Sequence, residues 1–294
     1  MVATGRGRWG VWAWLIALFA FGCASAPRQL TLDDLHQRGT AAGLEVQRLS
    51  GELFTLVALA PPQARSKVLR IYIEGDGLAW RSRYRLSAHP SPVTPTALNL
   101  MLVDPTPDKA YLARPCQYLQ TEACHPKYWS THLFSEEVIS GMSRALDALK
   151  DRGGYTHLEL VGYSGGGGVA VLLSARRDDI TGLMTVAGNL DTEAVCRLHG
   201  LTPLSASLNP ADVAEGLCGI SQHHFMGKED KIIPVSIYTS FAAHLSSIQA
   251  VSSVVVDDVT HQRGWEEQWA GLLQEYGLAP FRAQPTNERN YSVQ

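Results

Sequence analysis

The sequence has no strong excess of charge of either sign. Its 25 basic and 28 acidic residues leave a net charge of −3, and no basic block lies beyond the extreme N-terminus. Because nucleic-acid-binding proteins carry a basic patch or stripe, we expect no nucleic-acid partner. The chain is also not poor in apolar residues. At 45% hydrophobic and 18% charged it can bury a large core, which excludes a disordered protein.

Common phosphate- and metal-binding motifs are missing as well. The glycine run at residues 165–168 is not followed by the lysine and Ser/Thr of a P-loop, and it lacks G-x-G-x-x-G spacing. The five cysteines include no C-x-x-C pair, which is the usual spacing of a zinc site. The sequence therefore implies no metal and no organic cofactor.

An unbroken apolar run at residues 11–21 is too short to span a bilayer, which takes about 20 residues. Arg6 and Arg8 precede it, and small residues follow it. A positive start, a short apolar run and a small-residue end are typical of an export signal. Residues 1–26 are therefore expected to direct export and to take no part in the fold.

The end of that segment, Ala-Phe-Gly-Cys at residues 20–23, resembles the lipobox of bacterial lipoproteins. In that family a peptidase cuts before the cysteine, which then carries lipid. The resemblance implies lipidation of Cys23 and a membrane-anchored protein of the cell envelope that faces the periplasm. An ordinary secretory signal, cut near residues 24–26, is the alternative.

Export to an oxidising compartment makes the remaining four cysteines informative. An even number indicates two disulfides, and three connectivities are possible. We favour Cys116–Cys124 and Cys196–Cys218, because each pair closes a loop that is local in the sequence. Buried free thiols are the alternative.

One stretch combines an apolar run with a serine among glycines. Residues 157–163 predict a buried strand, and residues 169–173 predict the buried face of a helix. Between them lies Gly-Tyr-Ser-Gly-Gly at 162–166, the pattern G-x-S-x-G that turns a strand sharply into a helix and exposes the hydroxyl of Ser164. A flexible linker is a poorer interpretation, since linkers are not flanked by apolar runs on both sides.

Strand-like and helix-like segments alternate along residues 53–276. Such alternation predicts an α/β fold with a mainly parallel central sheet and helices on both faces. Residues 27–50 are expected to form a spacer and a surface helix, residues 51–278 the folded domain, and residues 279–294 a flexible tail. Irregular insertions are expected near residues 78–96, 114–133 and 192–219.

Three polar residues follow predicted strands in the order Ser164, Asp230, His261. In a parallel sheet the functional residues lie beyond the carboxyl ends of the strands. A histidine can take the proton of a serine hydroxyl, and a carboxylate fixes the tautomer of the histidine. The alternative acids are Glu229, next to Asp230, and Asp191, one strand earlier, whereas Asp257 and Asp258 lie too close to His261 along the chain. His223 and His224 lie on a predicted strand and are expected to be structural.

The turn Glu74-Gly75-Asp76-Gly77 follows the predicted strand at residues 67–73. Glycines there let the backbone approach a ligand closely. The turn resembles the place at which α/β-hydrolases carry the second donor of an oxyanion hole, and the resemblance implies that the backbone N–H of Gly165, with that of Asp76 or Gly77, forms one here. A simple tight turn at Asp76-Gly77 is the alternative. The Asp76 carboxylate is expected to point away, because it would repel a developing negative charge.

Residues 81–96 form an expected long loop, typical of a lid or a binding loop. Its three arginines, Arg81, Arg83 and Arg85, either meet an anionic head group or belong to a solvated face. Aromatic side chains in and near the loops could line an apolar pocket or serve packing; they are Trp80, Tyr84 and Trp129.

The motifs at 162–166, at Gly227-x-x-Asp230-x-x-x-Pro234 and at His261 together resemble the α/β-hydrolase superfamily over about residues 53–276. Glu74 stands where many members have a histidine. With the export signal, the turn after residue 73 is similar to poorly characterised exported bacterial members. The resemblance implies a serine hydrolase of the bacterial envelope that cleaves an ester or related acyl bond in a small molecule or lipid. An acyltransferase with the same triad and a non-catalytic binding lipoprotein are the alternatives.

Overall fold

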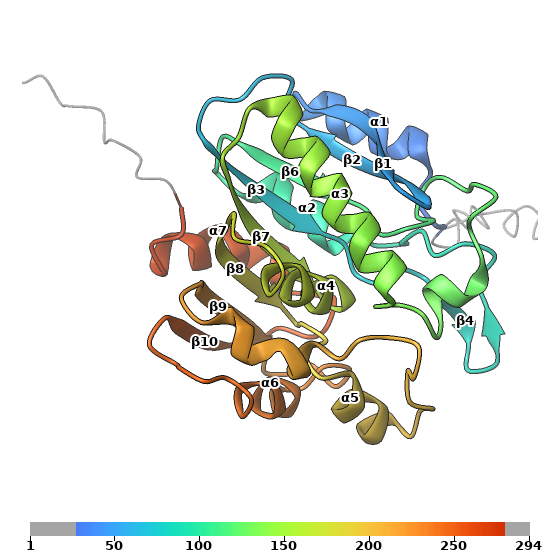
Figure 1. Ribbon diagram of the computed structural model, residues 1–294, viewed down its shortest axis with the longest axis vertical. Coiled ribbons are helices and arrows are strands. Elements are labelled where there is room, and N and C mark those ends of the chain that lie inside the picture. Colours follow the sequence, from blue (N-terminus) through green and yellow to red (C-terminus); the bar gives the residue numbers. More distant parts are fainter. Residues whose placement is uncertain (1–27, 280–294) are drawn as a thin grey trace, which may run out of the picture.

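The computed structural model describes residues 28–279. The expected export signal with Cys23, and nearly all of the expected C-terminal tail, lie outside the described residues. As predicted, the chain forms an α/β fold, in which a central eight-stranded, mostly parallel sheet has helices on both faces (Figure 1).

The central sheet has the strand order β1-β2-β6-β3-β7-β8-β9-β10. The first pairings, β1 with β2 and β2 with β6, are antiparallel, and all others are parallel. The parallel strands therefore bring their carboxyl ends to one edge of the sheet. The strands are β1 (Glu45–Gly51), β2 (Phe54–Ala60), β3 (Val68–Ile73), β6 (Lys109–Leu112), β7 (His157–Tyr163), β8 (Ile180–Val186), β9 (Ser221–Gly227) and β10 (Val251–Val256).

Two apolar clusters fill the space between the sheet and its helices. One joins the sheet to α3 (Glu136–Gly153), α4 (Gly165–Ser174) and α6 (Val235–Ala242). The other joins the opposite face to α1 (Leu32–Ala41), α2 (Thr96–Val103) and α7 (Trp265–Glu275). Figure 1 shows α3 and α4 in front of the sheet and α2 behind it. No helix within residues 28–279 has both the length and the apolar character needed to cross a membrane.

The folded region begins earlier than predicted. Residues 45–50, expected to belong to the spacer and surface helix, form the edge strand β1 together with Gly51. Only Leu49 and Gly51 of this strand are buried, so an edge strand with one covered face gives a weak apolar signal. Gly51 lies so close to α3 that a Cβ atom there would be 2.9 Å from the carbonyl oxygen of Gly141.

The three expected insertions contain regular structure that was not predicted. Residues 80–86 form a small separate hairpin of β4 (Trp80–Ser82) and β5 (Arg85–Leu86). Short 3₁₀ helices occur at Pro126–Trp129 and Pro210–Leu217, and α5 spans Thr192–His199. The signals of α5 were in the sequence, because Asp191 caps its start and Gly200 ends it in a left-handed conformation.

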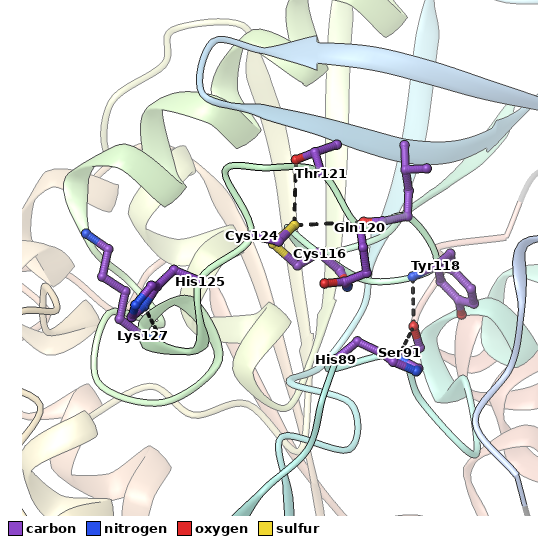
Figure 2. The surroundings of a disulfide bond; sticks show 10 residues. His89, Ser91, Cys116, Tyr118, Gln120, Thr121, Cys124, His125 and Lys127 are labelled. Carbon is purple, nitrogen blue, oxygen red and sulfur yellow. Dashed lines mark hydrogen bonds between the residues drawn. A yellow bond between two sulfur atoms is a disulfide. The ribbon is translucent and has the colours of Figure 1, made fainter.

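One of the two expected disulfides is present. Cys116 and Cys124 are bonded, with their Cα atoms 5.6 Å apart, in the segment drawn in Figure 2. The prediction of a Cys196–Cys218 bond is wrong, because both cysteines are free. Cys196 is buried in α5 and its thiol donates to the carbonyl of Thr202, just beyond the end of that helix, whereas Cys218 is exposed. Proximity in sequence did not bring these two side chains together.

Candidate active site

Ser164 occupies a sharp turn between β7 and α4, as the sequence predicted. Its backbone φ of 52° lies in the left-handed region, which a non-glycine residue rarely adopts. The turn is tight because a Cβ at Gly162 would lie 2.3 Å from the carbonyl oxygen of Gly166. Likewise, a Cβ at Gly166 would lie 2.3 Å from the carbonyl oxygen of Ile73. A side chain at either position would collide with the backbone, so both residues must be glycine. Their absence of a side chain lets Ser164 lie at the carboxyl edge of the sheet.

The structure brings Ser164, His261 and Asp230 into one hydrogen-bonded row. The Ser164 Oγ lies 3.0 Å from Nε2 of His261, and Nδ1 of His261 lies 2.8 Å from Oδ2 of Asp230. These residues come from the ends of β7, β10 and β9 and are separated by 97 and 31 positions in the sequence. The acid and the imidazole are both buried, so their geometry is fixed by the surrounding protein.

The other atoms of this row are held by backbone and aromatic groups. The second oxygen of Asp230, Oδ1, accepts hydrogen bonds of 2.8 Å from the backbone N–H groups of Ile232 and Ile233. The carbonyl of His261 accepts from the Tyr163 hydroxyl at 2.9 Å and from the indole N–H of Trp265 at 3.1 Å. These contacts fix the direction of the carboxylate and the position of the imidazole.

None of the alternative carboxylates forms a hydrogen bond with His261, which pairs with Asp230. Asp191 caps α5 and accepts from the Ser240 hydroxyl at 2.5 Å. Asp257 pairs with Lys228, and Glu229 is exposed. His224 is buried between Thr185 and Gln222, and its burial lowers its pKa to about 3.

Three backbone N–H groups near Ser164 make no hydrogen bond with any other described residue. They belong to Gly165, Asp76 and Gly77. The turn passes close to the serine, since a Cβ at Gly75 would lie 3.3 Å from the Cβ of Ser164. Free N–H groups beside a nucleophile can stabilise an oxyanion. The turn and the helix start thus supply donors of the expected type.

The Asp76 side chain does not point away, contrary to expectation. A Cβ at Gly165 would lie only 2.1 Å from Oδ1 of Asp76, so the carboxylate lies against the start of α4. It is neutralised by Arg114, whose Nη1 is 3.1 Å from the same oxygen. Arg114 is buried, which lowers its pKa, and Asp76 acts in the opposite direction.

Arg114 was not predicted as a site residue. Its guanidinium also donates to the carbonyl of Leu133 and lies over the Phe134 ring, with the centre of the guanidinium 5.4 Å from the ring centroid. The partner Asp76 is 38 positions away in the sequence, so no local pattern marks the pair. The ion pair explains how a carboxylate can lie beside the expected oxyanion donors.

Glu74, which stands at the usual histidine position, holds the turn to its neighbours. Its Oε1 accepts from the backbone N–H groups of Gly75 and Ala97, and its Oε2 accepts from the Tyr111 hydroxyl at 3.1 Å. Burial raises the pKa of its carboxyl to about 7. Glu74 therefore links β3, the start of α2 and β6, and it forms no hydrogen bond with Ser164.

The expected aromatic residues do not gather into one pocket wall. Trp80 and Tyr84 are exposed on the β4–β5 hairpin. Trp129 is buried in the core, and its indole N–H donates to the carbonyl of Ser87 at 3.2 Å. Trp129 therefore serves packing beneath the hairpin.

No known family profile matches this sequence, and no curated protein sequence matches it. Solved structures do match. Est1E from Butyrivibrio proteoclasticus is 13% identical with a TM-score of 0.57, and the match covers 79% of this chain and 97% of Est1E. The Pyrococcus furiosus esterase Pf2001 is 12% identical with a TM-score of 0.60, covering 85% and 96%.

An alpha-beta serine hydrolase homologue from Coxiella burnetii is 12% identical with a TM-score of 0.55, covering 80% of this chain and 95% of the homologue. At such low identities the likeness concerns the fold. The sheet order, the turn at Ser164 and these matches lead to one conclusion. The chain has the α/β-hydrolase fold.

Proposed function

We propose that this protein is a serine hydrolase that cleaves an ester or related acyl bond in a small molecule or lipid. The observation that carries the proposal is the unbroken row from Ser164 Oγ to His261, at 3.0 Å, and on to Asp230, at 2.8 Å. A serine hydroxyl needs such a base and acid to act as a nucleophile. Esterases among the matching structures are consistent with this reaction class.

In the proposed acylation, Ser164 Oγ attacks the substrate carbonyl carbon and its proton passes to Nε2 of His261. Asp230 accepts a hydrogen bond from Nδ1–H and stabilises the imidazolium. The N–H groups of Gly165 and of Asp76 or Gly77 stabilise the oxyanion, and each such donor contributes about 100- to 1000-fold in rate. Collapse of this intermediate breaks the ester bond, and the leaving alcohol takes the proton from His261.

Deacylation repeats the sequence with water. His261 takes a proton from the water, whose oxygen attacks the acyl carbon bound to Ser164. The second oxyanion collapses, the acid leaves, and the proton returns from His261 to Ser164 Oγ. An acceptor alcohol in place of water would make the same residues an acyltransferase, so the two reactions share the acyl-enzyme.

The same proposal places the enzyme in the bacterial envelope, held by lipid on Cys23. Its support is the sequence of residues 1–26 alone. Labelling of growing cells with a fatty acid analogue tests it. We expect label on the wild-type protein and none on Cys23→Ser, and equal label on both would contradict it.

The test of the chemistry is labelling with a fluorophosphonate probe, followed by peptide mapping. We expect label on Ser164, loss of label in Ser164→Ala and in His261→Ala, and full label in Ser174→Ala. Ser174 is a matched control, because its buried hydroxyl makes no hydrogen bond among the described residues. Label that persists in Ser164→Ala, or a folded wild-type protein that takes no label, would refute the proposal.

A further inference from the structure

The β4–β5 hairpin is the most exposed regular element at the carboxyl edge of the sheet. It stands apart from the central sheet and projects at the lower right of Figure 1. Residues 80–85 are all exposed, and they include Trp80 at 47% and Tyr84 at 87% of full exposure. A large aromatic side chain left in water costs free energy, so this surface is suited to a partner.

The hairpin also carries a concentration of one charge. Arg81, Arg83 and Arg85 alternate with the aromatic and polar residues, and no acidic residue occurs between Asp76 and Asp104. Within residues 28–279 none of these three arginines forms an ion pair. Arg81 donates a 3.4 Å hydrogen bond to Oε1 of Gln29, and the guanidinium of Arg83 lies 5.7 Å from the centroid of the Tyr84 ring, so the described residues leave all three positive charges without an anionic partner.

Hydrogen bonds hold the base of the hairpin in place. The backbone N–H of Ser87 donates to the carbonyl of Ala79 at 2.9 Å, and Trp129 donates to Ser87 from below. A few residues on, Ser91 Oγ accepts from the N–H of Tyr118 at 2.8 Å, next to the disulfide (Figure 2). Less conformational entropy is therefore lost on binding than for a flexible loop.

The first described residues lie beside the segment that follows the hairpin. Gln29 donates to the carbonyls of His89 and Ser91 at 2.7 and 2.8 Å, and the N–H of Leu30 donates to the carbonyl of Pro92 at 2.8 Å. Cys23 precedes Arg28 by five residues, which reach about 17 Å when fully extended. A lipid anchor at Cys23 would therefore keep the hairpin close to a bilayer surface.

We propose that the hairpin of residues 80–86 docks on an anionic lipid bilayer. The three guanidinium groups bind lipid phosphates, and Trp80 and Tyr84 enter the interface between head groups and acyl chains, where aromatic residues gather. This orientation turns the edge of the sheet that carries Ser164 toward the bilayer. The proposal goes beyond the hydrolase reaction and does not depend on it.

The test is cosedimentation with vesicles of equal parts phosphatidylcholine and phosphatidylglycerol. A chain that begins at Ala24 keeps the whole described fold and both core clusters and lacks Cys23, so lipidation cannot cause the binding. Replacing Arg81, Arg83 and Arg85 together by Gln is expected to weaken binding on the order of 100-fold. Trp80→Ala with Tyr84→Ala is expected to weaken it about 10-fold or more.

Matched controls lie away from the hairpin. The triple change of Arg48, Arg144 and Arg152 to Gln alters net charge equally, and Ile248→Ala removes another exposed apolar side chain. We expect both controls, and Ser164→Ala, to bind like the wild type. Equal binding by the hairpin variants, an equal loss in the charge control, or no binding of the wild type to anionic vesicles would overturn the proposal. Failure of the hydrolase reaction would instead appear in probe labelling, which this assay does not use.

Discussion

The candidate site has two sides that are built in different ways. On one side, β7, β9 and β10 carry Ser164, Asp230 and His261, which meet through two direct hydrogen bonds. On the other, the turn after β3 is held by ionisable side chains, of which Glu74 and Arg114 are buried and Asp76 is partly buried. There Asp76 pairs with Arg114, and Glu74 binds the start of α2 and Tyr111. In the proposed reaction the first side supplies the reacting groups, and the second positions the backbone N–H groups that face them.

The two sides also differ in how polar groups are compensated. Asp230 is satisfied by two backbone N–H groups and an imidazole. Asp76 depends on one buried cation, Arg114. Removing one member of a buried ion pair leaves the other without compensation, so the second side should be the more fragile in stability. The first should be the more sensitive in rate.

The largest effect is expected from Asp230→Asn, which should lower kcat on the order of 10⁴-fold because the amide disfavours the productive imidazole tautomer. Steady-state hydrolysis of a soluble nitrophenyl ester measures it. Asp191→Asn is the matched control, since Asn retains the helix cap and Asp191 does not contact His261. A greater loss of kcat in Asp191→Asn than in Asp230→Asn would mean that Asp191, and not Asp230, is the acid.

The sequence could identify the first side because its signals are local. G-x-S-x-G marks a turn within five residues, and Asp230 and His261 each follow a strand with its own apolar pattern. The fold class follows from the same alternation, although β1 and the β4–β5 hairpin were missed because their strands are short or half exposed.

The turn on the second side was predicted with its backbone donors, but the side chains that hold it could not be inferred in this way. Arg114 lies 38 positions from Asp76, and nothing around Arg114 distinguishes it from a surface arginine. Their pairing depends on the neighbouring ends of β3 and β6. The free state of Cys196 and Cys218 likewise depends on tertiary placement, which sequence spacing does not encode.

The next largest effect is expected from Arg114→Met, which leaves the Asp76 carboxylate unpaired beside Gly165. Because Asp76 is partly exposed, we expect a loss of about 3 kcal/mol in unfolding free energy, the low end for a broken buried pair. The kcat should also fall on the order of 100-fold, since the negative charge opposes the oxyanion. Urea unfolding and ester hydrolysis measure the two effects.

The double variant Arg114→Met with Asp76→Asn sharpens this test. Removing both charges should restore much of the lost stability and rate, because no carboxylate is then left uncompensated. If the double variant is as unstable and as slow as Arg114→Met alone, Arg114 acts through packing on Phe134 and not through its charge.

A pH-dependent effect is expected at Glu74. Its pKa is about 7 in the folded protein and near 4.5 when unfolded, so the folded state keeps a proton that the unfolded state has released. Stability from this group is fully present below pH 4.5 and is lost as pH rises toward 7. The loss is on the order of 3 kcal/mol. Glu74→Gln should lack this decline.

Urea unfolding across that pH window measures the difference between wild type and Glu74→Gln. The exposed Glu215→Gln serves as control and should follow the wild-type curve. A parallel pH profile for Glu74→Gln and the wild type would mean that Glu74 is ionised in the folded protein, as Asp76 is.

The smallest effect is expected from the disulfide that braces the turn side. Cys116→Ser with Cys124→Ser opens a loop closed over a separation of 8 residues, which should cost about 2.5 kcal/mol in unfolding free energy. The same segment carries Gln117, which accepts from the N–H of Arg114 and donates to the carbonyl of Gly75. Loosening it should therefore also lower kcat, by less than Arg114→Met does.

Thermal unfolding with and without reductant measures the stability change, with Cys218→Ser as the exposed free-thiol control. Loss of stability without any change in kcat would show that the disulfide braces only the outer loop, and that Arg114 and Gln117 hold the turn without it.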